Sequence, residues 1–412
     1  MKYYPLRPMQ RWMVDSHFEK AKSTMMNIGG LLKLSATIDM EHLAAAINYV
    51  LEKHDIFRCR FVFHPETSDL CQIFEGEVQK VFVEQISDRE FKKRMNKLRE
   101  PYYLINQPLY RIYLMQTPSA NYLYGDFYHA IMDGVSISYL FWSEIDAAYR
   151  GRTRGKALSY ADYVEAEAQI PVAELAEGHT YWQNMLANFD PEKHLLPSKV
   201  AGDAKWIKGD FSCEFKNFME EFFRTTGFNE NNYFLGASML ALAKLTGSGE
   251  SVISWTHNGR TTMRERRLMG LMLVQYPCAW KFDKDITVRE FLNRLGGQVQ
   301  TGMKYRKSLG IIYDEGIEDN CVTFLFQKEL YLDFILADTI AMPIYLPPNE
   351  ISAAENSLDI EIYATEMGTY DLALHYDASR YDEDDMKNFA ETLNKIIIDM
   401  QNGDRKISEI LN

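Results

Sequence analysis

The sequence predicts an α+β fold made of two lobes of similar size. Its 412 residues exceed the length that one ordinary hydrophobic core supports. In both halves, segments with the period-2 alternation of strands come between segments with the 3.6-residue spacing of helices. A stretch with the turn-forming residues Pro191, Pro197 and Gly202 separates the halves. We therefore expect an N-terminal lobe at residues 1–186 and a C-terminal lobe at residues 187–412.

The first lobe is expected to begin with a strand at residues 28–35 and a helix that Asp39 caps. Apolar residues follow Asp39 at helical spacing, namely Leu43, Ala46, Ile47, Val50 and Leu51. Two alternating segments, 110–117 and 121–128, predict a hairpin. Further strands are expected at 57–63, 72–74 and 81–85, and further helices at 88–99 and 135–149.

The second lobe repeats a similar alternation of elements. Helical spacing over residues 231–245 stops at Gly247, a residue typical of helix C-termini. Two alternating segments joined near Gly368 predict an antiparallel strand pair at 358–364 and 369–376. Further strands are expected at 209–215, 251–256 and 320–326, further helices from about Phe218, over 288–303 and over 384–400, and a loop around 343–348.

The net charge of −13 argues against nucleic acid as the main partner, because phosphate backbones need clustered Lys and Arg. Local basic clusters could still receive an anionic ligand, although a solvated surface is the commoner role for each. The clusters are Arg150, Arg152, Arg154 and Lys156; Arg264, Arg266 and Arg267; and Lys304, Arg306 and Lys307.

Five cysteines without CxxC spacing give no support to a zinc or redox motif. The N-terminus lacks the apolar run of a signal peptide, and no stretch reaches 18 apolar residues. We therefore expect no membrane partner and a reducing cytoplasm, with the cysteines as small buried hydrophobic residues.

Of the nine histidines, His129 stands in the sequence context that best suits chemistry. It follows an apolar and aromatic strand and precedes Asp133 and Gly134 at a tight turn. A histidine held at a strand end can act as a general base near neutral pH. Asp133 could hold the loop by accepting hydrogen bonds, and Gly134 could adopt a backbone conformation forbidden to other residues. His257 precedes a turn and is interpreted as a turn-edge residue.

No second motif competes with this one. A metal site at His129 would need further ligands at suitable spacing, and none is evident. GxSxG, P-loop and GxGxxG motifs are also missing from the sequence, so serine-hydrolase, kinase and dinucleotide-binding classes have no support.

The segment Phe127–Ser136 resembles the HHxxxDG signature of condensation domains of nonribosomal peptide synthetases, which belong with chloramphenicol acetyltransferase and other CoA-dependent acyltransferases. Companion motifs occur in the family's order from about residue 3 to residue 400. They are Pro5–Trp12, Asp39–Ala46, Lys53–Phe61, Asn106–Arg111, Tyr160–Tyr163, Tyr181–Trp182, Thr246–Gly247, Asn258–Arg260 and Gly270–Pro277.

The resemblance implies two chloramphenicol-acetyltransferase-like lobes that form a V-shaped pseudo-dimer around a central tunnel. His129 aligns with the family's functional histidine, which removes a proton from the acceptor amine or orients that amine and stabilises the tetrahedral intermediate. Asp133 aligns with a structural residue that pairs with an arginine of the second lobe. We expect this partner to be Arg260, so that the pair holds the motif loop across the lobe interface.

Two positions depart from the family pattern. Tyr128 replaces the first histidine of the signature and does not titrate near pH 7. Val274 stands where the family usually has asparagine. The residues expected to line the tunnel are Tyr128, Gly270, Met272, Val274 and Gln275.

The resemblance implies a stand-alone condensation enzyme that forms an amide between a carrier-protein-tethered acyl or aminoacyl thioester and an amine. The expected partners are carrier proteins and a small-molecule amine or alcohol. The acyl group would be linked to phosphopantetheine or CoA, with no bound metal or cofactor. Two alternatives stay open, namely an O- or N-acyltransferase that acts on a free small molecule, and a non-catalytic domain that recruits a carrier or another partner.

Overall fold

The computed structural model shows an α+β protein, as the sequence predicts. The structure describes residues 1–152, 155–187, 189, 193, 195–197, 206–209, 220–282, 285–310, 322–327, 334–344, 346, 357–365 and 368–412. No helix in these ranges is long and apolar enough to cross a membrane. Cys59, Cys71 and Cys278 are free and buried, whereas Cys213 and Cys321 lie outside the described residues.

The chain divides into two compact units that interleave along the sequence. Unit 1 comprises Met1–Ile170, Asn258–Leu273 and Tyr331–Ser352, and unit 2 comprises Pro171–His257, Val274–Leu330 and Ala353–Asn412. The sequence suggested continuous lobes at 1–186 and 187–412, and that division stays a prediction. The units differ from these lobes because two segments of the second half, Asn258–Leu273 and Tyr331–Ser352, belong to the same unit as the N-terminal half.

Unit 1 contains a six-stranded sheet with the strand order β12-β13-β2-β7-β6-β5. The central pair, β2 (Asn27–Leu34) and β7 (Asn121–Tyr128), is antiparallel, and β13 (Thr339–Ile344) pairs with β2. The other strands of this sheet are β5 (Val83–Gln85), β6 (Tyr110–Gln116) and β12 (Phe334–Leu336). A smaller sheet contains β1 (Tyr4–Pro5), β4 (Leu70–Ile73) and β3 (Arg60–Phe63).

In unit 1, the predicted helix after Asp39 forms, and two other predicted elements begin with a different backbone conformation from the one expected. In α2 (Met40–Lys53), Asp39 accepts a hydrogen bond from the His42 amide, and the apolar positions are buried. The predicted helix at 135–149 instead begins with a π-helical turn at Ser136–Phe141 before α4 (Trp142–Tyr149). The predicted strand at 57–63 begins with a 3₁₀ turn at Asp55–Arg58. The other helices are α1 (Pro8–Glu19), α3 (Asp88–Met95) and α5 (Tyr160–Ala168).

Unit 2 contains a second six-stranded sheet, with the order β10-β9-β11-β14-β15-β8. Its strands are β8 (Trp206–Gly209), β9 (Glu250–His257), β10 (Val274–Lys281), β11 (Val322–Gln327), β14 (Leu358–Ala364) and β15 (Tyr370–Asp377). The strand β11 runs parallel to β9 and β14, and β14 and β15 form the predicted antiparallel pair.

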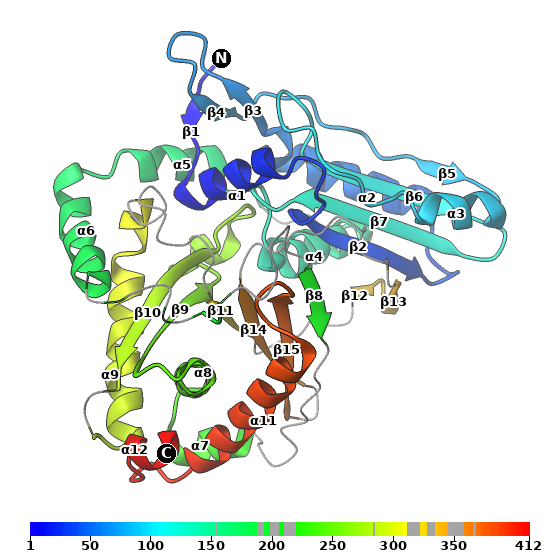
Figure 1. Ribbon diagram of the computed structural model, residues 1–412. Helices are drawn as coiled ribbons and strands as arrows, with labels where there is room; N and C mark the ends of the chain where they lie inside the picture. Colours follow the sequence, from blue (N-terminus) through cyan, green and yellow to red (C-terminus); the bar gives the residue numbers. More distant parts are fainter. Residues whose placement is uncertain are drawn as a thin grey trace. The chain divides into compact units, whose positions relative to one another are not determined.

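Helix α8 (Glu230–Thr246) forms the centre of the core of unit 2. Every residue from Tyr233 to Ala243 is buried, and Gly247 ends the helix in the left-handed conformation (φ 65°), as predicted. Figure 1 shows α8 between α9 (Val288–Lys304) and α11 (Glu383–Asp399) against the sheet. The remaining helices are α6 (Val172–Leu186), α7 (Glu220–Thr226) and α12 (Ile407–Leu411).

Several predicted elements lie partly outside the described residues. They are the crossing at 187–203, most of the strand at 209–215, the helix start near Phe218, the first two residues of the strand at 320–326 and half of the loop at 343–348. The first two residues of that expected loop, Pro343 and Ile344, instead end β13.

Candidate active site

His129 is the first residue after β7, where the strand turns sharply. Its amide donates to the Met26 carbonyl at 2.8 Å, and the Ile131 amide donates to the Tyr128 carbonyl at 2.9 Å. The imidazole is half-buried, and its Nδ1 is shielded from solvent with no hydrogen-bond partner in the described part of the chain. The loop therefore presents an imidazole with unused hydrogen-bonding capacity on a fixed backbone.

Burial lowers the pKa of His129 below its ordinary value, because a charged imidazolium is poorly solvated there. The negative charge of Asp133 and nearby backbone carbonyls act in the opposite direction but do not outweigh burial. The imidazole is consequently neutral at pH 7 and able to accept a proton.

A buried ion pair holds the other end of the motif. Arg260 Nη1 donates to Asp133 Oδ2 at 2.7 Å, and Nη2 donates to Oδ1 at 3.1 Å, so the pair is bidentate. Burial raises the pKa of Asp133, but the charge and hydrogen bonds of Arg260 outweigh that effect and leave it below its ordinary value. The carboxylate therefore stays ionised although its side chain is only 3% exposed.

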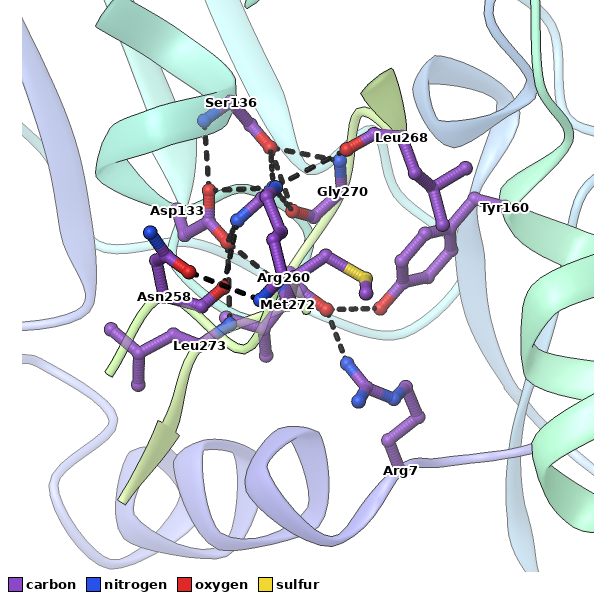
Figure 2. A network of polar contacts seen from close by, with 11 residues as sticks. Arg7, Asp133, Ser136, Tyr160, Asn258, Arg260, Leu268, Gly270, Met272 and Leu273 are labelled. Atoms are coloured by element: carbon purple, nitrogen blue, oxygen red, sulfur yellow. Dashed lines mark hydrogen bonds and ion pairs between the residues drawn. The ribbon is translucent and has the colours of Figure 1, made fainter. Parts of the chain in front are cut away.

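Backbone amides complete the coordination of the Asp133 carboxylate. Oδ2 accepts from the Met272 and Leu273 amides at 2.8 and 3.3 Å, and Oδ1 accepts from the Ser136 amide at 2.8 Å. Figure 2 shows these contacts converging on the carboxylate together with Arg260. The motif loop is thereby attached to the segment 258–273, which is distant in sequence.

Ser136 joins the same two segments through its hydroxyl. Its Oγ donates to the Gly270 carbonyl at 2.8 Å and accepts from the Gly270 amide at 3.0 Å and from Arg260 Nη2 at 2.7 Å. Gly270 has a φ of +150°, and a Cβ there would lie 2.2 Å from the Tyr160 ring. Both the backbone conformation and the close ring therefore require glycine at position 270.

A second buried network holds the motif loop through Ala130. Gln10 on α1 donates from Nε2 to the Ala130 carbonyl at 2.9 Å and exchanges hydrogen bonds with the amide of Gln72. Gln72 in turn donates to the Pro5 carbonyl at 2.8 Å. The Leu271 carbonyl accepts hydrogen bonds from the Tyr160 hydroxyl at 2.8 Å and from Arg7. Contacts at Ala130 and Asp133 thus fix the loop on both sides of Ile131–Met132.

Comparison with known proteins identifies the family of this chain. A family model described as "Condensation domain" matches residues 1–411. The chain belongs to the condensation-domain family. Among curated relatives, a plipastatin synthase of Bacillus subtilis (strain 168) is 20% identical over 325 residues, which cover 74% of this chain and 12% of that protein. Hybrid PKS-NRPS synthetase gkaA of Penicillium citrinum is 24% identical over 345 residues, covering 79% and 9%.

The chain therefore spans about a tenth of the length of these curated relatives. Solved structures with the same fold include the condensation domain from the monacolin K polyketide synthase MokA, with a TM-score of 0.80, 18% identity and 99% coverage of both chains. Another is the X-domain in its complex with OxyB from teicoplanin biosynthesis, with a TM-score of 0.79, 18% identity, and coverage of 100% of this chain and 96% of that chain.

For this condensation domain, the expected contact between Asp133 and Arg260 forms, and both residues lie in one compact unit. Arg260 was expected to reach Asp133 across an interface between lobes. The segment Asn258–Leu273 instead belongs to unit 1 together with Asp133. The ion pair therefore stabilises one compact unit from within.

The expectation for the backbone of Gly134 is wrong. Its φ is not in the left-handed region, because the chain is already helical at this position. A Cβ at Gly134 would meet no atom within 4 Å. Neither backbone conformation nor packing within the described residues therefore requires glycine there.

The five candidates for tunnel lining occupy different environments, and their role stays a prediction. Tyr128 is fully buried, and its hydroxyl donates to the Met13 carbonyl at 3.0 Å. Gly270 and Met272 contribute backbone groups to the network around Asp133. Val274 is buried in β10, and Gln275 Nε2 donates to Thr256 Oγ1 at 3.0 Å.

His257 ends β9, with its ring tilted against that of Trp255 at a centroid separation of 5.1 Å, as suits a turn-edge residue. In the described ranges, no group of three or more His, Cys, Asp or Glu side chains could hold a metal ion.

Sequence reasoning missed the roles of Gln10 and Ser136. Both residues lie within segments that resemble family motifs, and this was the only available signal. Their partners are 120 and 134 residues away along the chain, so no local pattern identifies the contacts.

Proposed function

We propose that this chain forms an amide bond between an acyl or aminoacyl group, carried as a thioester on the phosphopantetheine arm of a carrier protein, and an amine. The observation that carries the proposal is the His129 imidazole, whose Nδ1 has no hydrogen-bond partner among the described residues, on a loop fixed at Ala130 and Asp133. The family supports the reaction class, since condensation domains transfer acyl groups and work with carrier proteins.

In the proposed reaction, the acceptor nitrogen attacks the thioester carbonyl. The new C–N bond forms, the C–S bond breaks, and the sulfur leaves as the thiol of the arm. His129 accepts the proton that the nitrogen loses and returns a proton to the departing sulfur. The thioester is already activated, so the protein contributes mainly the position of the reactants and of the proton acceptor.

Asp133 and Arg260 act as positioning residues in this proposal. Their pairing and the amides of Met272 and Leu273 consume the hydrogen-bonding capacity of the carboxylate. Asp133 is therefore not available as the base, and His129 is the ionisable residue of the motif that remains free to react.

The test is an intact-mass assay with acylated carrier proteins and a panel of amines and alcohols. We expect amide product with the wild-type chain and a loss of about 100-fold or more in rate for His129→Ala, the scale of general-base catalysis. The matched control is His179→Ala on α6, in unit 2, which should retain the wild-type rate.

Full product formation by His129→Ala would contradict the proposal. Turnover of acyl-CoA with a free alcohol, in the absence of any carrier protein, would instead indicate O-acyl transfer. Carrier binding without turnover of any donor would indicate a recruitment domain.

A further inference from the structure

The loop at residues 261–267, here termed the arginine loop, carries three arginines and one acidic residue on a chain whose net charge is −13. Arg264, Arg266 and Arg267 are all exposed, and Met263 beside them is 73% exposed. Within the described ranges, none of these three arginines makes an ion pair or a side-chain hydrogen bond.

The other two basic clusters of the sequence differ in this respect. Arg150 pairs with Asp146 and Asp338, and Lys304 pairs with Glu177. Their cations are at least partly neutralised within the chain. Of these three clusters, the arginine loop is the one in which no cation has an ion pair among the described residues.

The backbone of the arginine loop is ordered by its one acidic residue. Glu265, which is 7% exposed, accepts hydrogen bonds from the Thr261 amide, the Thr261 hydroxyl and the Thr262 amide at 2.8–2.9 Å. The Glu265 amide donates back to the Thr262 hydroxyl at 3.1 Å. The Glu265 carboxylate thus bonds to the loop's own residues and holds its backbone in one conformation. An ordered backbone lowers the entropy cost of binding a partner through the arginines.

The arginine loop is continuous with the candidate active site. It begins directly after Arg260, which pairs with Asp133, and it ends three residues before Gly270, which bonds to Ser136. A macromolecule that binds the loop would therefore be held beside the segment that fixes the His129 loop.

We propose that the arginine loop is the docking surface for an acidic face of the carrier protein that delivers the acyl thioester. This proposal rests on the proposed function, because it names the partner of the same site. Exposed arginines around an exposed methionine match the composition of protein interfaces. The exposed Met263 beside the arginines adds apolar area that a protein face would cover and a phosphate group would not, so the observations favour a protein surface over the phosphate of the prosthetic arm.

The test compares the wild-type chain with the triple variant Arg264→Gln, Arg266→Gln, Arg267→Gln. The matched control is Lys92→Gln, Lys93→Gln, Lys97→Gln, which removes the same charge from exposed positions of unit 1 in and just after α3. Three donors with one acyl group are used: the loaded carrier protein that turns over with the wild-type chain, the acyl-phosphopantetheine and the acyl-pantetheine.

For the arginine variant, we expect KM for the loaded carrier to rise by about tenfold or more and its dependence on salt to weaken, while kcat changes little. KM for both small donors should stay at the wild-type value. A charge-reversal experiment gives a result that only the proposal predicts. Replacing the arginines with Glu should weaken binding, and replacing the acidic residues of the carrier with Lys should then restore it.

An unchanged carrier KM in the arginine variant, or an equal rise in the lysine control, would overturn the proposal. A rise for acyl-phosphopantetheine but not for acyl-pantetheine would overturn it in favour of a phosphate site. Direct binding of the loaded carrier, measured by NMR chemical-shift perturbation, separates the two proposals. Arginine-dependent binding without product refutes the proposed function alone, and product without arginine dependence refutes the docking surface alone.

Discussion

At the scale of single residues, His129 and Asp133 show how one environment produces opposite ionisation behaviour. His129 is half-buried and Asp133 is buried, and the pKa of each lies below its ordinary value, which leaves the imidazole neutral and the carboxylate charged. The difference arises from the partners, because Asp133 has a guanidinium and backbone amides whereas Nδ1 of His129 has no partner among the described residues. The motif therefore contains one neutral imidazole and one carboxylate ion that is held by hydrogen bonds.

The rate of acyl transfer should fall on acidification with a midpoint below the ordinary histidine value of about 6.5. The pKa of His129 is lowered, so the imidazole stays unprotonated and active as the pH falls through that value, and it loses activity only at lower pH. The measurement is the pH profile of the wild-type chain and of His129→Ala with one acceptor amine. A midpoint above 6.5 that disappears in the variant would contradict the lowered pKa.

Replacement of Arg260 by Met should destabilise the protein by about 3–5 kcal/mol, because it leaves the Asp133 carboxylate buried without its counter-charge. The added change Asp133→Asn should recover part of this loss by removing the buried charge. The measurement is urea denaturation at pH 7. Arg294→Met, which breaks an exposed pair with Glu290 on α9, is the control and should cost far less. Equal losses for Arg260→Met and Arg294→Met would refute the argument.

At the scale of elements, helix α1 contributes to the site without supplying a reactive group. Gln10 reaches from α1 to the Ala130 carbonyl, and its hydrogen bonds with Gln72 connect the same point to β4. Both glutamines are fully buried, so each lost hydrogen bond would leave a polar group without solvent. The helix therefore acts as a fixed support for the motif loop.

Gln10→Met should lower stability by about 1–3 kcal/mol through the unsatisfied Ala130 carbonyl and Gln72 amide. It should also lower kcat by about tenfold with little change in KM, because a displaced loop misplaces the His129 imidazole. The control is Gln169→Met, at the exposed C-terminus of α5. If Gln10 only positions the loop, the pH profile of Gln10→Met matches that of the wild-type chain. A loss of stability with an unaltered kcat would show that Gln10 has a purely structural role.

Elements were predictable from sequence where their determinants are local. The spacing of Leu43, Ile47 and Val50 gave α2, and Gly247 marked the end of α8. The π-helical turn at Ser136–Phe141 was not predicted, since its apolar residues have the same spacing as those of an α-helix. The ion pair of Arg260 came from family resemblance, whereas the hydroxyl contacts of Ser136 depend on a fold that brings distant segments together.

At the scale of the whole molecule, each unit is built from segments that are not contiguous in the chain. The strand β13, from the second half, completes the sheet of unit 1 by pairing with β2, and Asn258–Leu273 carries Arg260 to Asp133. Hydrophobic periodicity predicts that such segments form strands or turns, but it carries no information about which sheet or loop they join. The sequence therefore predicts the elements themselves but not which segments of the second half join unit 1.

The division into two units predicts which regions become less stable when the ion pair between Arg260 and Asp133 is lost. In Arg260→Met, amide hydrogen exchange should accelerate at Met272 and Leu273, whose N–H groups bond to Asp133, and at Ser136. Exchange in α8 should stay slow, because its buried residues pack within the core of unit 2. Mass spectrometry of peptides after exchange measures both regions in one sample. Equal acceleration in α8 would show that the two units open together and that the ion pair stabilises the entire chain.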